Sequence, residues 1–175
     1  MELRPLADEY APYFERYIAL VPEPDALPIL SAQAAVLAGV SSSLPAAKEH
    51  FRYAEGKWTI REIFGHLIDA ERVFGYRSFC ISRGESAPLP AFDEDAYVLR
   101  SGYDGRTVAE LVREFTLVRQ SNLVFLSALS PEQWIRTGTA SGRPISVRAL
   151  PFIMAGHVRH HLRILLERYG VPNAS

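Results

Sequence analysis

The C-terminal histidines have the residue type and spacing of a metal-binding pair. Three of the five histidines of the chain lie in one segment, residues 156–162, with the sequence GHVRHHL. At about 100° per residue around a helix, His157 and His161 lie one turn apart in the middle of an apolar face, whereas His160 lies at its edge. This spacing lets one helix present two imidazole nitrogens to the same ion. The pair therefore predicts a metal site that does not include His160.

His66 is the candidate for a third ligand. It lies within an apolar helical segment and shares its face with Ile63, Ala70 and Val73. A single histidine on an apolar face is more often a core residue with one hydrogen bond, and for the C-terminal pair alone both interpretations stay open. A shared metal would satisfy several buried imidazoles at once, so the third histidine favours one divalent ion.

Two further polar residues lie near His66 on the same helix. Asp69, three residues on, is expected to accept an imidazole N–H and fix the tautomer; the alternative is an ion pair with Arg72 or Arg77. Arg77 lies on the face of His66 and is a candidate to bind a carboxylate of a small-molecule ligand, because the guanidinium fork matches a carboxylate. Its alternative is an ion pair with Asp69 or with a surface partner.

The remaining candidates carry weaker signals. Cys80 is the only cysteine, so the chain can form neither an internal disulfide nor a cysteine-based zinc site. We expect it to be a buried apolar side chain, several turns from His66. Tyr97, Tyr103 and the acidic run 93–95 either line a pocket or belong to a solvated loop with a local helix cap.

Four long helices must position these residues. Apolar residues recur at helical spacing in the segments 25–42, 59–83, 107–129 and 146–169, and in a shorter segment, 8–20. The second and third long segments open with Thr59 followed by Glu62 and Thr107 followed by Glu110, the pattern of a capping box. No sustained alternation of apolar and polar residues occurs, so no strand is expected.

These segments predict an all-α fold, a four-helix bundle in a single domain spanning residues 1–175. The connection 84–106 is long for a compact domain. Because a helix of about 20 residues is about 30 Å long, such a crossover lets the second and third helices run parallel instead of forming a hairpin.

The composition excludes several classes of protein. The chain has 175 residues, 48% hydrophobic and 22% charged, with 19 basic and 20 acidic residues and a net charge of −1. This balance argues against a nucleic-acid partner. The apolar stretch 26–40 is too short to span a bilayer, and the N-terminus lacks an apolar signal region. We expect a cytoplasmic protein with a small-molecule substrate and no membrane partner; a homodimer stays open.

The segments 58–71 (WTIREIFGHLIDAE) and 156–162 resemble the DinB/YfiT-like superfamily, and the resemblance extends over nearly the whole chain. It implies a four-helix bundle in up-down-down-up order with a long crossover between the second and third helices. It also implies a metal triad of one histidine from the second helix and a His-x3-His pair from the fourth, matched here by His66, His157 and His161. The metal implied is zinc or nickel.

The resemblance also bears on function, because the superfamily includes transferases and isomerases that use low-molecular-weight thiols. Three neutral imidazoles leave coordination positions open, as in catalytic sites. We therefore expect a metal-dependent enzyme acting with a small-molecule thiol, of the S-transferase type. A metal-dependent hydrolase and a non-enzymatic, stress-associated metal-binding protein are the alternatives.

Overall fold

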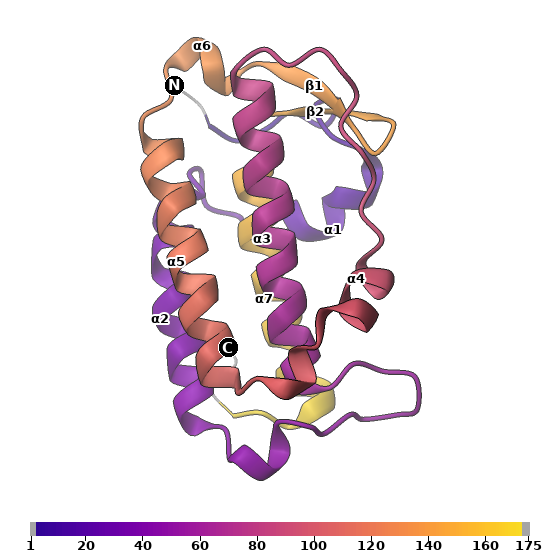
Figure 1. The fold of residues 1–175 in the computed structure, drawn as a ribbon. Helices are drawn as coiled ribbons and strands as arrows, with labels where there is room; N and C mark the ends of the chain where they lie inside the picture. Colours follow the sequence, from indigo (N-terminus) through magenta and orange to yellow (C-terminus); the bar gives the residue numbers. More distant parts are fainter. Residues whose placement is uncertain (1–2, 173–175) are drawn as a thin grey trace.

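The computed structural model describes residues 3–172, so residues 1–2 and 173–175 of the expected domain lie outside the described part. Four long helices form the bundle in Figure 1: α2 (Leu27–Ser43), α3 (Ile60–Ser82), α5 (Val108–Ser127) and α7 (Ala149–Tyr169). α3 and α5 run in one direction, and α2 and α7 run in the other. The predicted four-helix bundle with up-down-down-up order is thereby confirmed.

Side-chain caps fix where the helices begin. At the start of α3, Thr59 Oγ1 accepts from the Glu62 amide at 3.1 Å and Glu62 Oε2 accepts from the Thr59 amide at 2.6 Å. The same capping box opens α5 at Thr107, as the sequence predicts. α7 begins three residues later than expected, because Ser146 belongs to a strand; its hydroxyl accepts from the amide of Ala149 at 3.1 Å.

Shorter elements surround the bundle. The segment 8–20 forms two short helices, η1 (Pro12–Phe14) and α1 (Glu15–Ile18), and α1 packs on α7. The crossover returns along the length of the bundle from the end of α3 to the start of α5 (Figure 1). It contains α4 (Glu94–Ser101) and η3 (Tyr103–Gly105), and the other short helices are η2 (Ala46–Lys48) and α6 (Pro131–Trp134).

The expectation of no strand is wrong. β1 (Thr137–Ala140) and β2 (Arg143–Ser146) form an antiparallel hairpin at the end of the bundle where α3 ends (Figure 1). Ser141 and Gly142 form its two-residue turn, with φ of 53° and 71°, the conformation that matches the twist of a hairpin. Strands of four residues are too short for alternation to be recognised. The crossover stabilises them: the Leu89 amide donates to Thr139 O at 2.8 Å.

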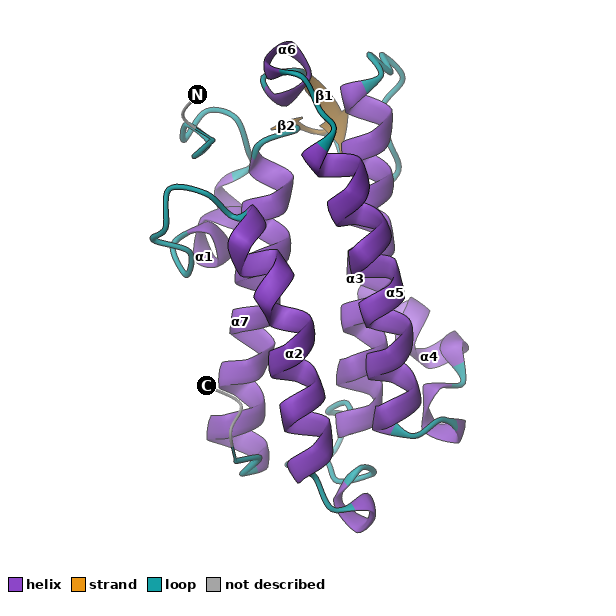
Figure 2. Ribbon diagram, turned by 90° about the vertical axis from the view of Figure 1, so that its left-hand side faces the viewer, coloured by secondary structure: helices purple, strands orange, loops and turns teal. Residues whose placement is uncertain are grey.

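The helices pack as a ring in which α2 contacts α5 and α7, and α3 contacts the same two helices. Figure 2 shows α2 beside α7 and α3 beside α5. Hydrophobic clusters fill the two ends of the interior. Between them lies a polar layer, which we define as Gln33, Glu71, Arg119 and Asn122.

The polar layer is held by a buried ion pair. Arg119 donates from Nε and Nη2 to the two carboxylate oxygens of Glu71, each at 2.7 Å, and from Nη1 to Gln33 Oε1 at 3.0 Å. Gln33 Nε2 in turn donates to the carbonyl of Ala155 at 2.7 Å. Charge and hydrogen bonds are therefore satisfied across all four helices, which a buried charge requires.

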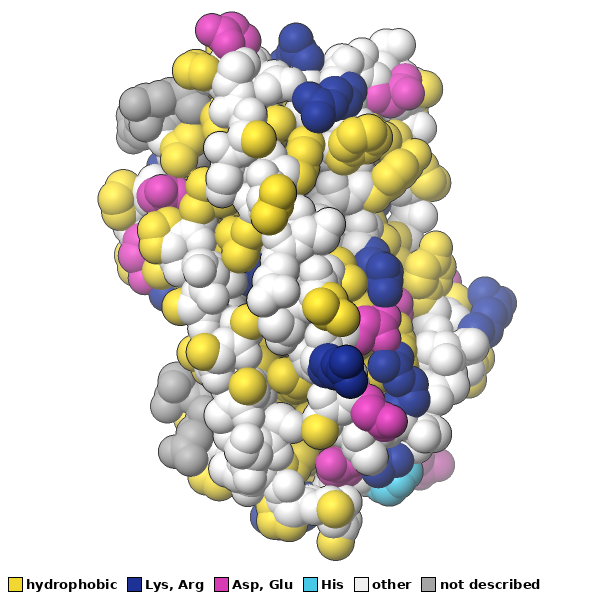
Figure 3. Space-filling view, turned by 60° about the vertical axis from the view of Figure 1, so that its left-hand side comes forward, with side chains coloured by type: hydrophobic (Ala, Val, Ile, Leu, Met, Phe, Trp, Pro, Cys, Tyr) yellow, Lys and Arg dark blue, Asp and Glu magenta, His cyan; other side chains and the backbone are white. Residues whose placement is uncertain are grey.

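On the face shown in Figure 3, acidic and basic side chains lie close together, and hydrophobic side chains are scattered among them. Among the residues that the structure describes, no helix combines the length and the apolar character needed to cross a membrane.

Candidate metal centre

The structure brings the three predicted histidines together in the interior of the bundle. His66 on α3 and His157 on α7 approach to 2.9 Å between their Nε2 atoms, and the Nε2 atoms of His157 and His161 are 3.1 Å apart. All three side chains are buried, and their ligand atoms lie within 4.8 Å of one another. His160 is half-buried beside them and is not part of the cluster.

Burial keeps these histidines neutral. It lowers the pKa of His66 to about 4, and it holds the pKa of His157 and of His161 well below the usual value; neighbouring histidines add to the effect. Neutral imidazole is the form that binds a metal. Three neutral nitrogen donors are therefore available at pH 7.

The geometry fits one divalent ion. In a tetrahedral site with metal–nitrogen bonds of about 2.0–2.1 Å, neighbouring nitrogens are about 3.3 Å apart, close to the separations of 2.9 and 3.1 Å at His157. Hydrogen bonds alone do not satisfy the cluster, because the one lone pair of His157 Nε2 accepts a single N–H. A cation would accept the lone pairs of all three Nε2 atoms.

Glycine permits the close packing around His157. A Cβ at Gly156 would lie 1.9 Å from the carbonyl oxygen of Tyr17, so only glycine lets α1 rest on α7 at this point. The Tyr17 ring then packs edge-on against His157 at 5.2 Å between centroids. On the other side, the Trp58 ring lies 4.7 Å from that of His66. This aromatic shell keeps water from most of the cluster.

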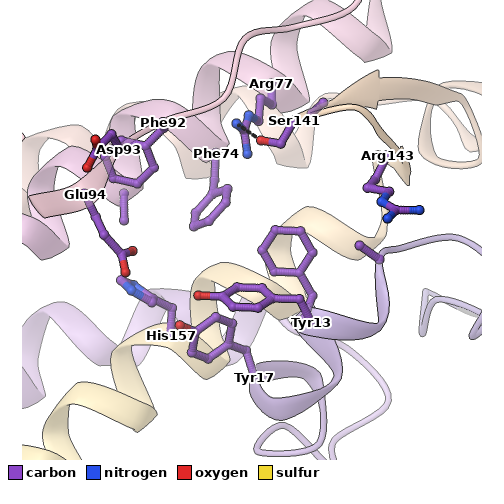
Figure 4. A pocket seen from close by; sticks show the side chains of 14 residues that line it. Tyr13, Tyr17, Phe74, Arg77, Phe92, Asp93, Glu94, Ser141, Arg143 and His157 are labelled. Carbon is purple, nitrogen blue, oxygen red and sulfur yellow. Dashed lines mark hydrogen bonds between the residues drawn. The ribbon is translucent and has the colours of Figure 1, made fainter. Parts of the chain in front are cut away.

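A cavity of about 460 Å³ reaches His157 (Figure 4). Its walls come from α3, the crossover, the hairpin and the N-terminal segment. They are mainly aromatic, with Tyr13, Phe14, Tyr17, Phe74 and Phe92. The N-terminal aromatic residues of the cavity were not predicted from the sequence; their signal was the close spacing of Tyr13, Phe14 and Tyr17 within the segment 8–20.

The acidic run 93–95 both caps a helix and lines a cavity, the two alternatives that the sequence left open. Asp93 caps α4 by accepting from the Ala96 amide at 3.0 Å, and it also lines the cavity. Glu94 is half-buried in the same cavity, and its side chain extends toward His157 in Figure 4. Burial, reinforced by Asp95, raises the pKa of Glu94.

A second cavity, of about 290 Å³, reaches His161. Trp58, Asp95 and Tyr169 are among the residues that line it. The two cavities therefore touch different members of the histidine cluster.

Asp69 does not accept the hydrogen bond from His66 that the sequence predicts. Its Oδ1 accepts a hydrogen bond from the Tyr103 hydroxyl at 2.6 Å, and His66 Nδ1 has no hydrogen-bond partner among the described residues. The expected contact with His66 is therefore wrong, and so is the alternative of an ion pair with Arg72 or Arg77 within residues 3–172. The helical face is shared, but the ring of Tyr103 lies against Gly65 and draws Asp69 toward η3.

Arg77 is buried rather than exposed, with 3% of its surface accessible, and it lines the cavity that reaches His157. Its Nη2 donates to the carbonyl of Pro90 and to the hydroxyl of Ser141, each at 2.9 Å. Neither an ion pair with Asp69 nor a surface ion pair forms within the described chain. Cys80 is buried, as expected.

Comparisons with known proteins agree with the fold of this chain. The model of the DinB superfamily matches residues 29–165. YfiT from Bacillus subtilis, described as a probable metal-dependent hydrolase with an unusual four-helix bundle topology, is similar in structure with a TM-score of 0.74 and 18% identity, over 97% of this chain and 99% of that chain.

The mycothiol-dependent maleylpyruvate isomerase is also similar in structure, with a TM-score of 0.67 and 15% identity. The match covers 90% of this chain and 67% of that chain. At these identities the two structures support the fold. No curated protein matches the sequence at a significant level.

Proposed function

This chain belongs to the DinB superfamily, and we propose that it is a metal-dependent enzyme that holds one divalent ion, zinc or nickel, through His66, His157 and His161. The observation that carries the proposal is the convergence of three buried, neutral imidazoles beside a cavity of about 460 Å³. A structural metal site would be closed, whereas a cavity that reaches a ligand gives a substrate access to the ion.

We further propose that the enzyme acts with a small-molecule thiol, in a reaction of the S-transferase type. A divalent ion with three neutral ligands would lower the pKa of a thiol or a water molecule that reaches its open position. A transfer reaction needs two reactants at the metal. One cavity reaches His157 and the other reaches His161, so each reactant would have its own route to the ion. The buried Cys80 is several turns from His66, so the thiol would come from solution.

The protein's own residues would bind and shield the reactants. Tyr17 and Trp58 cover the histidines and exclude water, which strengthens electrostatic interactions inside the site. Arg77 is the candidate to bind the carboxylate of a small-molecule ligand, because it lines the cavity and has no carboxylate partner among residues 3–172.

One observation favours hydrolysis as the second candidate. The Glu94 carboxylate extends toward His157 in the same cavity. A carboxylate in this position is able to accept a proton from an attacking water. YfiT, which shares the fold, is described as a probable metal-dependent hydrolase.

The proposal includes a cytoplasmic location and no membrane partner. It includes no nucleic-acid partner either, which the net charge of −1 supports. It also includes a homodimer. Exposed apolar side chains on α3 and α5, among them Phe79, Leu117 and Val124, support this. Analytical ultracentrifugation at several concentrations tests the oligomeric state.

A cobalt-loaded sample tests the thiol chemistry. The protein is titrated with glutathione, mycothiol, bacillithiol and cysteine, and a thiolate-to-cobalt charge-transfer band is expected with at least one of them. The His160→Ala variant should retain the band, and the His157→Ala variant should lose it together with the metal.

The absence of a band with all four thiols, in a sample shown to contain cobalt, would contradict thiol activation. Assays with ester and amide substrates, comparing the wild type with Glu94→Gln, would then test hydrolysis. A metal-loaded protein inactive in both assays would favour a non-enzymatic metal-binding role.

A further inference from the structure

Arg77 is a buried cation without a counter-ion among the described residues. Its guanidinium uses only Nη2 for hydrogen bonds, and both acceptors are uncharged oxygens. The other N–H groups have no protein acceptor within residues 3–172, and the side chain lines the cavity. Desolvation lowers the pKa of Arg77, and a buried charge of this kind is costly unless an anion compensates it.

Three segments that are distant in sequence converge on this guanidinium. Arg77 comes from α3, Pro90 from the crossover and Ser141 from the turn of the hairpin. Figure 4 shows the Arg77–Ser141 hydrogen bond at the edge of the cavity, above Phe74. The contacts occupy both N–H groups of Nη2 and hold the guanidinium in one orientation, so the Nε–H and Nη1–H groups stay free to donate to an anion in the cavity.

Ser141 holds this position in an unfavourable backbone conformation. Its φ of 53° lies in the left-handed region, where glycine, asparagine and aspartate are the usual residues. Strained backbone tends to occur where function requires it. The strain places a hydroxyl on Arg77, which a glycine at this position would not provide.

The charge of the cavity limits the anion that it accepts. Asp93 and Glu94 line the same cavity as Arg77, so they disfavour a dianion such as a phosphate monoester. A carboxylate carries one negative charge and is able to accept a charge-assisted hydrogen bond from a free N–H group of Arg77. Arg143 is at the rim, and its guanidinium is directed away from the other side chains in Figure 4.

The cavity between Arg77 and His157 is apolar. Phe14, Phe74 and Phe92 contribute its walls. The Cα positions of residues 66 and 77 are about 16 Å apart along the α3 axis. A ligand bound at both ends therefore needs an apolar body between its carboxylate and its reacting atom.

We infer that Arg77, oriented by Ser141 and Pro90, is a carboxylate subsite, and that the substrate is a small monocarboxylate with an aromatic or aliphatic body. This inference rests on the proposed function, which places the reaction at the histidine cluster. It assigns the apolar cavity to the acceptor substrate rather than to a polar thiol.

Direct binding tests the subsite without catalysis. Isothermal titration calorimetry measures the Kd of 3-phenylpropionate, 4-phenylbutyrate, 3-phenylpropionamide and 2-phenylethyl phosphate. Each compound is titrated into the metal-loaded wild type and into the His161→Ala variant, in which a carboxylate has no intact metal site to bind. The carboxylates are expected to bind in both proteins, and more tightly than the amide and the phosphate.

Two substitutions test the roles of Arg77 and Ser141. Each is made in the wild type and in the His161→Ala background. Arg77→Met should weaken carboxylate binding about 10- to 100-fold, the range for a charge-assisted hydrogen bond in a desolvated site. Ser141→Gly relieves the backbone, so it should fold; loss of one hydrogen bond to Arg77 should weaken binding about 2- to 10-fold. Arg143→Gln, on the same hairpin, is the matched control and should change the Kd less than about threefold.

Several results would overturn the subsite. These are no carboxylate binding at millimolar concentrations, an amide bound as tightly as its acid, a phosphate bound more tightly, or a Kd unchanged in both Arg77→Met and Ser141→Gly. Failure of the proposed function gives a different result: carboxylates would still bind through Arg77, while the cobalt-loaded protein would show no thiolate band and no hydrolysis.

Discussion

The hydroxyl of Tyr103 donates a 2.6 Å hydrogen bond to Asp69, and this contact joins the end of the crossover to the helix that carries His66. The Tyr103 ring lies against Gly65, where a Cβ would be 2.0 Å from the ring. The crossover is thus attached to α3 directly beside a metal-ligand candidate.

Replacing Tyr103 by phenylalanine removes this hydrogen bond and leaves the half-buried Asp69 carboxylate without its donor. We expect a loss of about 1.5–3 kcal/mol in the free energy of unfolding, the range of hydrogen bonds to charged groups. Urea denaturation measures it. Tyr97→Phe, on an exposed residue of the same crossover, should change the stability little, and equal effects of the two changes would contradict the assignment.

The histidine cluster makes a clear prediction for metal stoichiometry. Alanine at His66, His157 or His161 should lower the affinity for zinc or nickel by more than about 100-fold, because loss of a ligand exceeds the 10–100-fold effect of an outer partner. His160→Ala should keep one ion per chain, since His160 is outside the cluster. Elemental analysis after dialysis measures the metal content of each variant. If His161→Ala kept its metal and His160→Ala lost it, the ligand would be His160 and not His161.

The metal-free protein should become less stable as the pH falls from 7 to 5. Burial lowers the pKa of His66 from 6.5 to about 4, so below pH 6.5 the unfolded chain binds a proton that the folded chain does not. The stabilisation is therefore complete above pH 6.5 and is lost as the pH decreases toward 4. The slope is about 1.4 kcal/mol per pH unit for each proton taken up on unfolding.

Urea unfolding of the metal-free protein at several pH values gives this slope. His66→Gln should reduce it, whereas His50→Gln, a change at an exposed histidine, should leave it unchanged. A wild-type stability that is constant from pH 7 to 5 would show that the buried histidines take up no proton on unfolding.

The packing of α1 on α7 depends on Gly156. Gly156→Ala should destabilise the protein by about 1–3 kcal/mol, because its Cβ would displace the backbone of Tyr17. Gly39→Ala is the matched control: a Cβ there meets nothing within 4 Å, and alanine should stabilise α2 by about 0.5–1 kcal/mol. Thermal denaturation measures both changes, and a Gly156→Ala variant as stable as the wild type would show that α1 moves freely.

The long elements and the histidine cluster were predictable from the sequence because local signals define them. Capping boxes at Thr59 and Thr107 mark the starts of two helices, and helical angles separate His161 from His160. The family model and the two similar structures agree with the fold inferred in this way.

The surroundings of the cluster were not predictable because they depend on contacts between distant segments. The hairpin is stabilised by pairing with Leu89 in the crossover, and Asp69 turns to Tyr103, 34 residues away. Helical angles show which face a side chain occupies but not which neighbour covers that face. Arg77 is the clearest case, since its burial requires the crossover and the hairpin together.

The polar layer has a consequence for how accurately the cluster is assembled. A slip of α7 along α3 by one residue would move His157 by about 1.5 Å relative to His66, whereas metal–ligand distances tolerate about 0.2 Å. Apolar contacts are not directional, whereas the hydrogen bond from Gln33 to the carbonyl of Ala155 is, and a slip would break it. The polar layer thus fixes the axial position of α7. The helices are aligned before an ion binds, so the affinity for the metal is not reduced by the cost of aligning them.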